Sequence, residues 1–310
     1  MMNYMSHTSK MTGRRLPLVR TLLTMRALLT LSALFSLCTV SYASTASNVV
    51  TPPIKTTIEL PLQGVTLEYK ANVRLLQVLD DANASFNANT SSNENASGSI
   101  GYFPLSAQLF DKNNTQANES NKANKTIEAK KRNVFSQLDA FSVEEPEANL
   151  VRQQLASFQY LNRVFIELDR NAVISQSGKN SLLVSSSHTN KSSDGQTQAF
   201  SLYLPQRPTS IQLMGAMKES VTMNLIEHGT LNDYLDALPN GFVGESADKS
   251  VAYVVQPDGV VQTIQYAYWN EQSVYLAPGA IVFMAFYSLP SEYSTLNQDI
   301  VDLLRHKVGL

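Results

Sequence analysis

The sequence has very little cysteine or tryptophan, with one of each among its 310 residues. The cysteine, Cys38, lies inside the N-terminal apolar run described below, so residues 44–310 have no thiol. This excludes disulfides, thiolate catalysis and cysteine-rich metal sites from those residues. Their fold must therefore be stabilised by packing alone.

Charge is also scarce, because Lys, Arg, Asp and Glu make up only 16% of the residues. Five of the 24 basic residues, and none of the 26 acidic ones, lie within residues 1–43, which leaves the remainder with a formal net charge of −7. No basic stripe remains that would neutralise a phosphate backbone, so we expect no nucleic-acid partner. Anionic lipid surfaces are disfavoured for the same reason.

The uncharged apolar run Ala27–Val40 has the length of a signal-peptide core and is short for a spanning helix of ~20 residues. Basic residues precede the run, and small residues at Ser41 and Ala43 follow it. We therefore expect residues 1–43 to be a secretory signal peptide and the mature chain to lie in the periplasm with no membrane span. An uncleaved membrane anchor is the alternative.

The first half of the remaining chain mixes strand and helix patterns. Alternating runs at Thr57–Leu62 and Val65–Tyr69 predict two strands around a tight turn. Asn72 is placed to cap a following helix, and the Asn-rich and Ser-rich stretch Asp80–Gly98 predicts a loop. Further strands are expected at 100–103, 107–110, 164–168 and 200–204, with a pair of helices over about 126–163.

The second half has a more regular pattern. It predicts strands at 210–214, 221–226, 251–255, 260–266 and 280–286, and a helix at 231–238 that Thr230 caps. Several strands around one helix indicate an α+β arrangement.

The last segment, 291–307, predicts an amphipathic helix. Its apolar side chains repeat at helical spacing on one side: Tyr293, Leu296, Ile300, Leu303 and Leu304. This face must be buried, either against its own domain or against a partner protein.

The chain from about residue 55 to 310 resembles the capsule biosynthesis GfcC-like family of exported Gram-negative proteins. The resemblance lies in the order and spacing of several short stretches. They are Asn162-Arg163, Leu168-Asp169, Arg207-Pro208, Thr230-Leu-x-x-Tyr-Leu235, Ala247-Asp248-Lys249, Val254-Val-Gln-Pro-Asp-Gly259, Tyr268-Trp-Asn270, Ala277-Pro-Gly279 and Leu296-Asn297. The Asn-rich tracts 83–99 and 113–125 and the Ser-rich tract 185–198 stand out as insertions.

This resemblance implies two β-grasp domains, at 55–205 and 206–288, with a helical hairpin inserted in the first and the amphipathic helix at the C-terminus. It further implies a periplasmic, non-enzymatic accessory protein in capsule or exopolysaccharide biosynthesis and export. The expected partners are polysaccharide, outer-membrane polysaccharide export proteins, or both.

Two groups of residues are candidates for ligand binding. Tyr266, Tyr268 and Trp269 form an aromatic cluster, and Tyr266 and Tyr268 would share one side of a strand. Such rings either contact the C–H faces of sugars or complete the domain core. Arg163 either pairs with Asp169 or offers its guanidinium to the carboxylate of an acidic sugar.

We find no catalytic, metal-binding or cofactor-binding motif. The histidines beyond the signal peptide, His188, His228 and His306, have no other metal ligand at a suitable spacing. We therefore predict no enzyme activity, metal or cofactor. A hydrolase acting on the same polysaccharide, through a pair of carboxylates, and an envelope adhesion module are the alternative functions.

Overall fold

The computed structural model describes residues 55–89, 101–112, 122–185, 197–272 and 274–309. The predicted signal peptide lies outside these residues, as does most of each Asn-rich or Ser-rich tract. The described residues form one compact unit.

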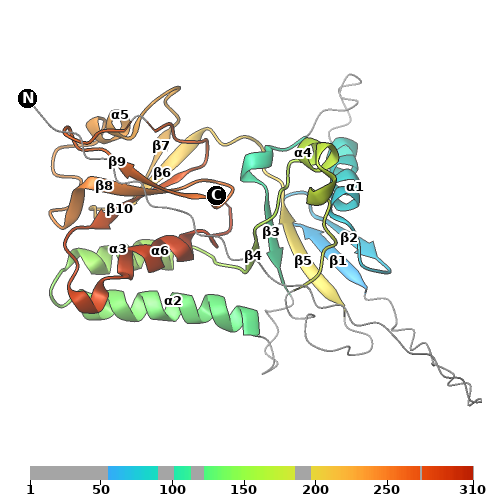
Figure 1. Cartoon of the computed structure of the whole chain (residues 1–310), viewed down its shortest axis with the longest axis horizontal. Coiled ribbons are helices and arrows are strands. Elements are labelled where there is room, and N and C mark those ends of the chain that lie inside the picture. Colours follow the sequence, from blue (N-terminus) through green and yellow to red (C-terminus); the bar gives the residue numbers. More distant parts are fainter. Residues whose placement is uncertain (1–54, 90–100, 113–121, 186–196, 273, 310) are drawn as a thin grey trace, which may run out of the picture. The chain divides into compact units, whose positions relative to one another are not determined.

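The first sheet has five strands in the order β2-β1-β5-β3-β4 (Figure 1). The strands are β1 Thr56–Leu60, β2 Val65–Tyr69, β3 Gln108–Asp111, β4 Arg163–Val164 and β5 Gln198–Tyr203. β1 and β5 pair in parallel, and the other neighbours pair antiparallel. The first and last strands of this sheet therefore lie side by side, although about 140 residues separate their paired residues Ile58 and Phe200.

One face of the first sheet carries its core. Ile58, Leu60, Phe200 and Leu202 alternate with more polar residues along β1 and β5 and are buried. Helices α1 Leu75–Asn89 and α4 Arg170–Ser175 contribute to the same hydrophobic cluster. This pattern follows from the period of two in a strand, which places alternate side chains on the same face.

The second sheet has five strands in the order β7-β6-β10-β8-β9. The strands are β6 Ser210–Gly215, β7 Val221–Asn224, β8 Ala247–Val255, β9 Val261–Gln265 and β10 Ile281–Phe286. β10 pairs in parallel with β6 and antiparallel with β8. Helix α5, Leu231–Asp236, packs in a cluster on one face, and the carboxylate of Asp233 accepts the Thr230 backbone N–H at its start.

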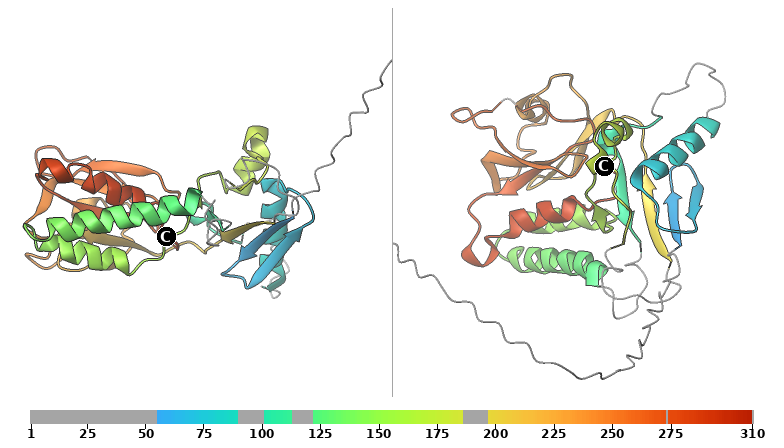
Figure 2. Two further views of the ribbon diagram at one scale, coloured as in Figure 1. Left: turned by 90° about the horizontal axis from the view of Figure 1, so that it is seen from below. Right: turned by 45° about the vertical axis from the view of Figure 1, so that its right-hand side comes forward.

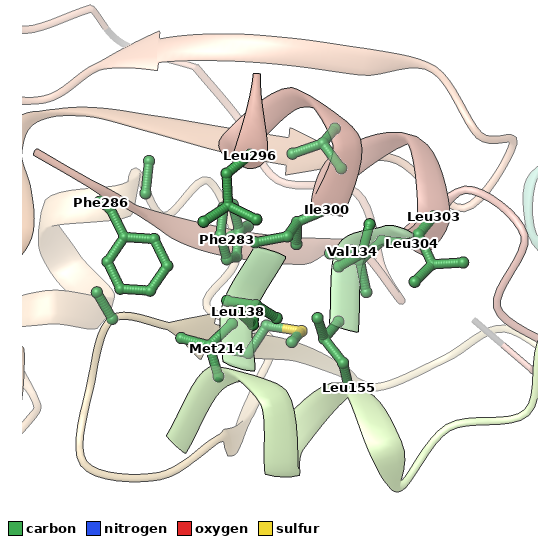
Figure 3. Packing of buried hydrophobic residues seen from close by; sticks show 14 of the residues in the cluster. Val134, Leu138, Leu155, Met214, Phe283, Phe286, Leu296, Ile300, Leu303 and Leu304 are labelled. Carbon is green, nitrogen blue, oxygen red and sulfur yellow. The ribbon is translucent and has the colours of Figure 1, made fainter. Parts of the chain in front are cut away.

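Three helices cover the other face of the second sheet. They are α2 Lys122–Phe141, α3 Glu147–Ala156 and α6 Leu296–Leu304, and both views in Figure 2 show them beside this sheet. Figure 3 shows Leu138 of α2, Leu155 of α3 and Ile300 of α6 in one hydrophobic cluster with the β10 side chain Phe283. The side chain of α3 Gln154 donates to the Gly215 carbonyl and accepts the Gly215 N–H, which ties α3 to the end of β6.

The structure corrects several sequence predictions. The stretch expected to be a loop from Asp80 is helical to Asn89. Asn180, not Asn72, receives a backbone N–H, that of Leu76, in the first turn of this helix. Residues 101–103 are not a strand, and a 3₁₀ helix, η1 Pro104–Ser106, follows them.

The strand expected at 164–168 is also wrong beyond Val164. Only Arg163–Val164 pairs with β3, and Glu167 and Leu168 continue without strand pairing. Helix α4 follows, with the Asp169 side chain accepting the Asn171 N–H at its start. Two further short 3₁₀ helices are η2 Ser177–Lys179 and η4 Ser291–Tyr293.

The predicted α+β class is confirmed, with two five-stranded sheets among the described residues. α2 and α3 follow one another between β3 and β4 and are in contact. The β-grasp assignment, the hairpin insertion and the domain boundaries at 205 and 288 remain predictions.

Candidate functional site

A cavity of about 480 Å³ lies beside the segment that contains Arg163. This volume falls in the range of small-molecule sites. Its lining comes from three parts of the chain, η1 with its flanks, the segment from β4 to the start of α4, and the β8–β9 turn. The lining residues are Phe103, Pro104, Leu105, Ala107, Arg163, Val164, Phe165, Ile166, Glu167, Leu168, Asp169 and Asp258.

The β8–β9 turn brings Asp258 to the cavity. Pro257, Asp258 and Gly259 form the turn, with Gly259 at a positive φ of 87° that an L side chain rarely adopts. The Asp258 carboxylate accepts the Val260 N–H at 2.9 Å and holds the turn. A Cβ on Gly259 would also lie 2.5 Å from the Phe165 ring, so glycine allows the turn to approach that ring closely.

Arg163 is only 5% exposed, and backbone carbonyls accept the hydrogen bonds of its guanidinium. Its Nη2 donates to Pro257 O at 2.6 Å and to Ala107 O at 3.5 Å, and its Nη1 donates to Arg305 O at 3.5 Å. Burial lowers its pKa to about 10, with Asp258 opposing that shift. Arg163 therefore remains charged and joins the cavity wall to the β8–β9 turn and to the end of α6.

Phe165 is the aromatic centre of this wall and is 43% exposed. The Arg305 guanidinium carbon lies 4.5 Å from its ring centroid and that of Arg163 lies 5.5 Å away. The His306 ring meets it edge-on with centroids 5.5 Å apart. Arg305 also donates to Gly259 O at 2.8 Å, so cations and turn hold the ring in place.

His306 is buried beneath this wall. Its Nδ1 accepts the Arg163 backbone N–H at 3.2 Å. Burial, followed by the nearby charges of Lys130, Arg305 and Arg163, lowers its pKa to about 4, while a hydrogen bond with the Leu161 backbone opposes this. The imidazole is therefore neutral near pH 7 and acts as a hydrogen-bond acceptor within the fold.

Three carboxylates line the cavity. Glu167 forms an ion pair with Lys179 at 2.7 Å, and that hydrogen bond lowers the pKa of Glu167. Asp169 and Asp258 each accept a backbone N–H at Oδ1, and neither forms an ion pair within 4 Å in the described parts of the chain.

The structure brings together two of the predicted site residues, Arg163 and Asp169, which both line the cavity. They form no ion pair with each other within the described ranges, so the structure does not show the pairing offered as one alternative. Phe165, Glu167 and Asp258 were not predicted. The Pro257-Asp258-Gly259 turn was recognisable as a turn, but nothing in the sequence placed it beside Arg163.

The predicted aromatic cluster lies elsewhere and is divided. β9 ends at Gln265, so Tyr266 and Tyr268 do not share one side of a strand as expected. Tyr266 is partly buried against the hydrophobic cluster between the second sheet and α5, and its hydroxyl donates to Asp248 O. Tyr268 and Trp269 lie in a turn and are 96% and 77% exposed. These two rings are available to a ligand and do not complete the core.

The predicted partner-docking face of the C-terminal helix is covered by the chain itself. Leu296, Ile300, Leu303 and Leu304 are fully buried against α2, α3 and β10, and Tyr293 packs at the margin (Figure 3). The helix α6 is also shorter than the predicted 291–307, since a 3₁₀ turn precedes it. Of the two alternatives, the structure has this helix docked on its own chain.

Comparison with known proteins bears on residues 219–309, which match the family model for the capsule biosynthesis GfcC C-terminal region. The expected resemblance to the GfcC-like family is confirmed. The GfcC-like match contains β7, α5, β8 to β10 and α6. It includes Asp258 and the aromatic turn, whereas Arg163 and Asp169 precede it.

The chain is also similar to the Uncharacterized protein YjbG of Escherichia coli strain K12, with 27% identity over 165 residues. The alignment covers 52% of this chain and 60% of that relative. Among the helices that the structure describes, none combines the length and the apolar character needed to cross a membrane.

Proposed function

We propose that this chain is an exported, non-enzymatic accessory protein of capsule or exopolysaccharide biosynthesis and export that binds polysaccharide in the Arg163 cavity. The association with capsule biosynthesis comes from the family match over residues 219–309. The N-terminal signal pattern supports a periplasmic location. On this proposal residues 55–205 and 206–288 are β-grasp domains, and the parallel pairing of the first and last strands in each sheet supports that assignment.

The cavity is the observation that carries this proposal. Sugar recognition needs aromatic or apolar surface for C–H faces and fixed polar groups for hydroxyls. Phe103 and Phe165 supply aromatic rings, and Asp169, Asp258 and Glu167 supply acceptors. The hydrogen bonds and cation–π contacts around Phe165 hold one wall in place before a ligand arrives, which limits the entropy cost of binding.

A binding measurement tests this proposal. Surface polysaccharide from the cells that make the protein is titrated against the exported chain by calorimetry. We expect Phe165→Ala to weaken binding about tenfold through loss of the aromatic contact. Tyr287→Ala, which removes an exposed ring that does not line the cavity, is the matched control. Equal binding by the wild type and Phe165→Ala would place the glycan elsewhere, with Tyr268 and Trp269 as the next site to vary.

A deletion strain tests the biological role. We expect deletion to lower the amount of surface polysaccharide and the wild-type gene to restore it. Normal polymer in the deletion strain, together with no glycan binding, would contradict the proposal and favour an adhesion module. Release of reducing ends from the polymer by the purified chain would instead favour the hydrolase alternative. Capture of an outer-membrane export protein without glycan would favour a protein partner.

A further inference from the structure

The charges around the Arg163 cavity are unequal. Its lining contains three carboxylates, from Glu167, Asp169 and Asp258, and one guanidinium, from Arg163. Lys179 pairs with Glu167, which leaves the lining with two unpaired carboxylates facing one buried cation. Arg305, whose guanidinium carbon lies 4.5 Å from the Phe165 ring centroid, pairs with Asp302 at 3.8 Å and so does not offset these carboxylates. The charge of the lining is therefore negative, in the same sense as the net charge of residues 44–310.

Arg163 is poorly placed to receive an anion. Its Nη2 donates to Pro257 O at 2.6 Å and to Ala107 O, and its Nη1 donates to Arg305 O. These bonds use three of the five N–H groups of the guanidinium, so in the described parts of the chain a carboxylate ligand would meet at most two available N–H groups and would also lie near Asp258. The contacts of Arg163 thus position the wall of the cavity, and its charge offsets that of Asp258.

Asp169 and Asp258, in contrast, retain accepting capacity. A carboxylate has two oxygens with about four lone-pair sites, and each of these residues uses Oδ1 for one backbone N–H. The second oxygen of each accepts no hydrogen bond in the described parts of the chain. Such oxygens suit donors, and sugar hydroxyls are donors.

We infer that the cavity selects an uncharged sugar unit and disfavours a uronic acid. This inference rests on the proposed polysaccharide-binding function. Hydroxyl groups of the sugar donate to Asp169 and Asp258, and its C–H face lies against Phe165. A carboxylate on the sugar is repelled by the same two side chains. This reverses the sequence-based alternative in which Arg163 receives an acidic sugar.

The test compares two forms of one polymer. The surface polysaccharide of the producing cells is prepared with its C6 carboxyls reduced to alcohols and, separately, with its C6 alcohols oxidised to carboxylates. We expect the exported chain to bind the reduced form about tenfold more tightly at low salt, and less selectively at high salt because ions screen the repulsion. Stronger or equal binding of the oxidised form would overturn the inference.

Two substitutions assign the selectivity to the cavity. Asn keeps the backbone hydrogen bond of both aspartates, because its amide oxygen accepts the same N–H group. The double variant Asp169→Asn/Asp258→Asn is therefore expected to fold and to reduce the preference to about twofold. Asp236→Asn, at an exposed position on α5, should leave the preference unchanged.

The outcomes distinguish a failure of the charge selectivity from a failure of the proposed polysaccharide binding. If both polymer forms bind equally, or if the double variant keeps the full preference, the charge selectivity is wrong while glycan binding stands. If neither form binds, the proposed function fails and the inference fails with it. A thermal unfolding curve of the double variant that matches the wild type excludes misfolding as the cause of a changed preference.

Discussion

The two sheets have the same strand order and the same strand directions, but they are buried to different extents. In each sheet a leading hairpin is followed by a helix, and the last strand enters the centre parallel to the first. In the first sheet the final strand β5 has two residues on one face, Ala199 and Tyr203, that are only partly buried. In the second sheet the corresponding strand β10 is apolar throughout, and all six of its residues are buried.

Helices explain the difference. Helices pack against both faces of β10, with α5 on one side and α2, α3 and α6 on the other. A strand buried on both faces needs a continuous apolar sequence, whereas a strand buried on one face needs only alternation. Strands at the same place in one topology can therefore have either a continuous apolar sequence or an alternating one. The pattern depends on whether helices cover both faces of the strand or only one.

The largest expected effect comes from core leucines in the two regions. Leu138 on α2 is fully buried in the cluster between the second sheet and its three covering helices. Leu79 on α1 is fully buried in the cluster of the first sheet. We expect Leu138→Ala and Leu79→Ala each to lower the free energy of unfolding by about 2–5 kcal/mol, measured by urea denaturation.

Hydrogen exchange then sharpens the comparison. Leu138→Ala should reduce amide protection mainly in β10 and α6, because these elements pack against α2. Leu79→Ala should reduce it mainly in β1 and β5. The same exchange pattern from both variants would break the distinction between the two cores.

The next effect is the pH dependence of the free energy of unfolding that arises from His306, which lies just after α6. Burial lowers the pKa of His306 to about 4 in the folded chain, whereas the unfolded chain titrates near ~6.5. As pH falls between these values only the unfolded state gains the proton, so the free energy of unfolding drops by on the order of 2–3 kcal/mol from pH 7 to pH 4.

Urea denaturation at four pH values across this range measures the loss. His306→Asn should flatten that part of the pH dependence, since it removes the titrating group. His228→Asn is the matched control because His228 is largely exposed, and the pH dependence should survive it. An unchanged slope in His306→Asn would show that other groups dominate.

The smallest effect is expected at the aromatic turn of the second region. Trp269 is 77% exposed, so Trp269→Ala should change the free energy of unfolding by less than about 0.5 kcal/mol in denaturation followed by circular dichroism. Acrylamide should quench the native fluorescence of this single tryptophan efficiently. A loss above about 1 kcal/mol would mean that the turn contributes to packing.

Local patterns predicted most strands and helices correctly, because alternation and helical spacing report directly on a buried face. The failures occurred where distant residues decide the structure. Residues 80–89 have a loop-like composition, yet Tyr69 donates to Asp81 and Asn83 accepts the Gly101 N–H. Such contacts outweigh weak helix propensity.

The candidate site was only partly predictable. Arg163 and Asp169 stood out by resemblance, and both line the cavity. Asp258 did not, because it comes from a turn about 95 residues further along the chain and only the tertiary structure brings it there. Residues 164–168 were predicted as a strand because they are rich in β-branched and aromatic side chains, but that composition also suits a cavity wall.

The placement of α2 and α3 has a consequence for how the chain can be divided. These helices precede β4 and β5 in the sequence, yet the surface that covers them is supplied by β10 and α6. A fragment that ends near residue 205 would retain the apolar faces of α2 and α3 but would lack β10 and α6. Those faces would be exposed to solvent, so we expect the fragment to aggregate. A nascent chain has the same apolar surface exposed until β10 and α6 have been synthesised, more than a hundred residues after α2 and α3.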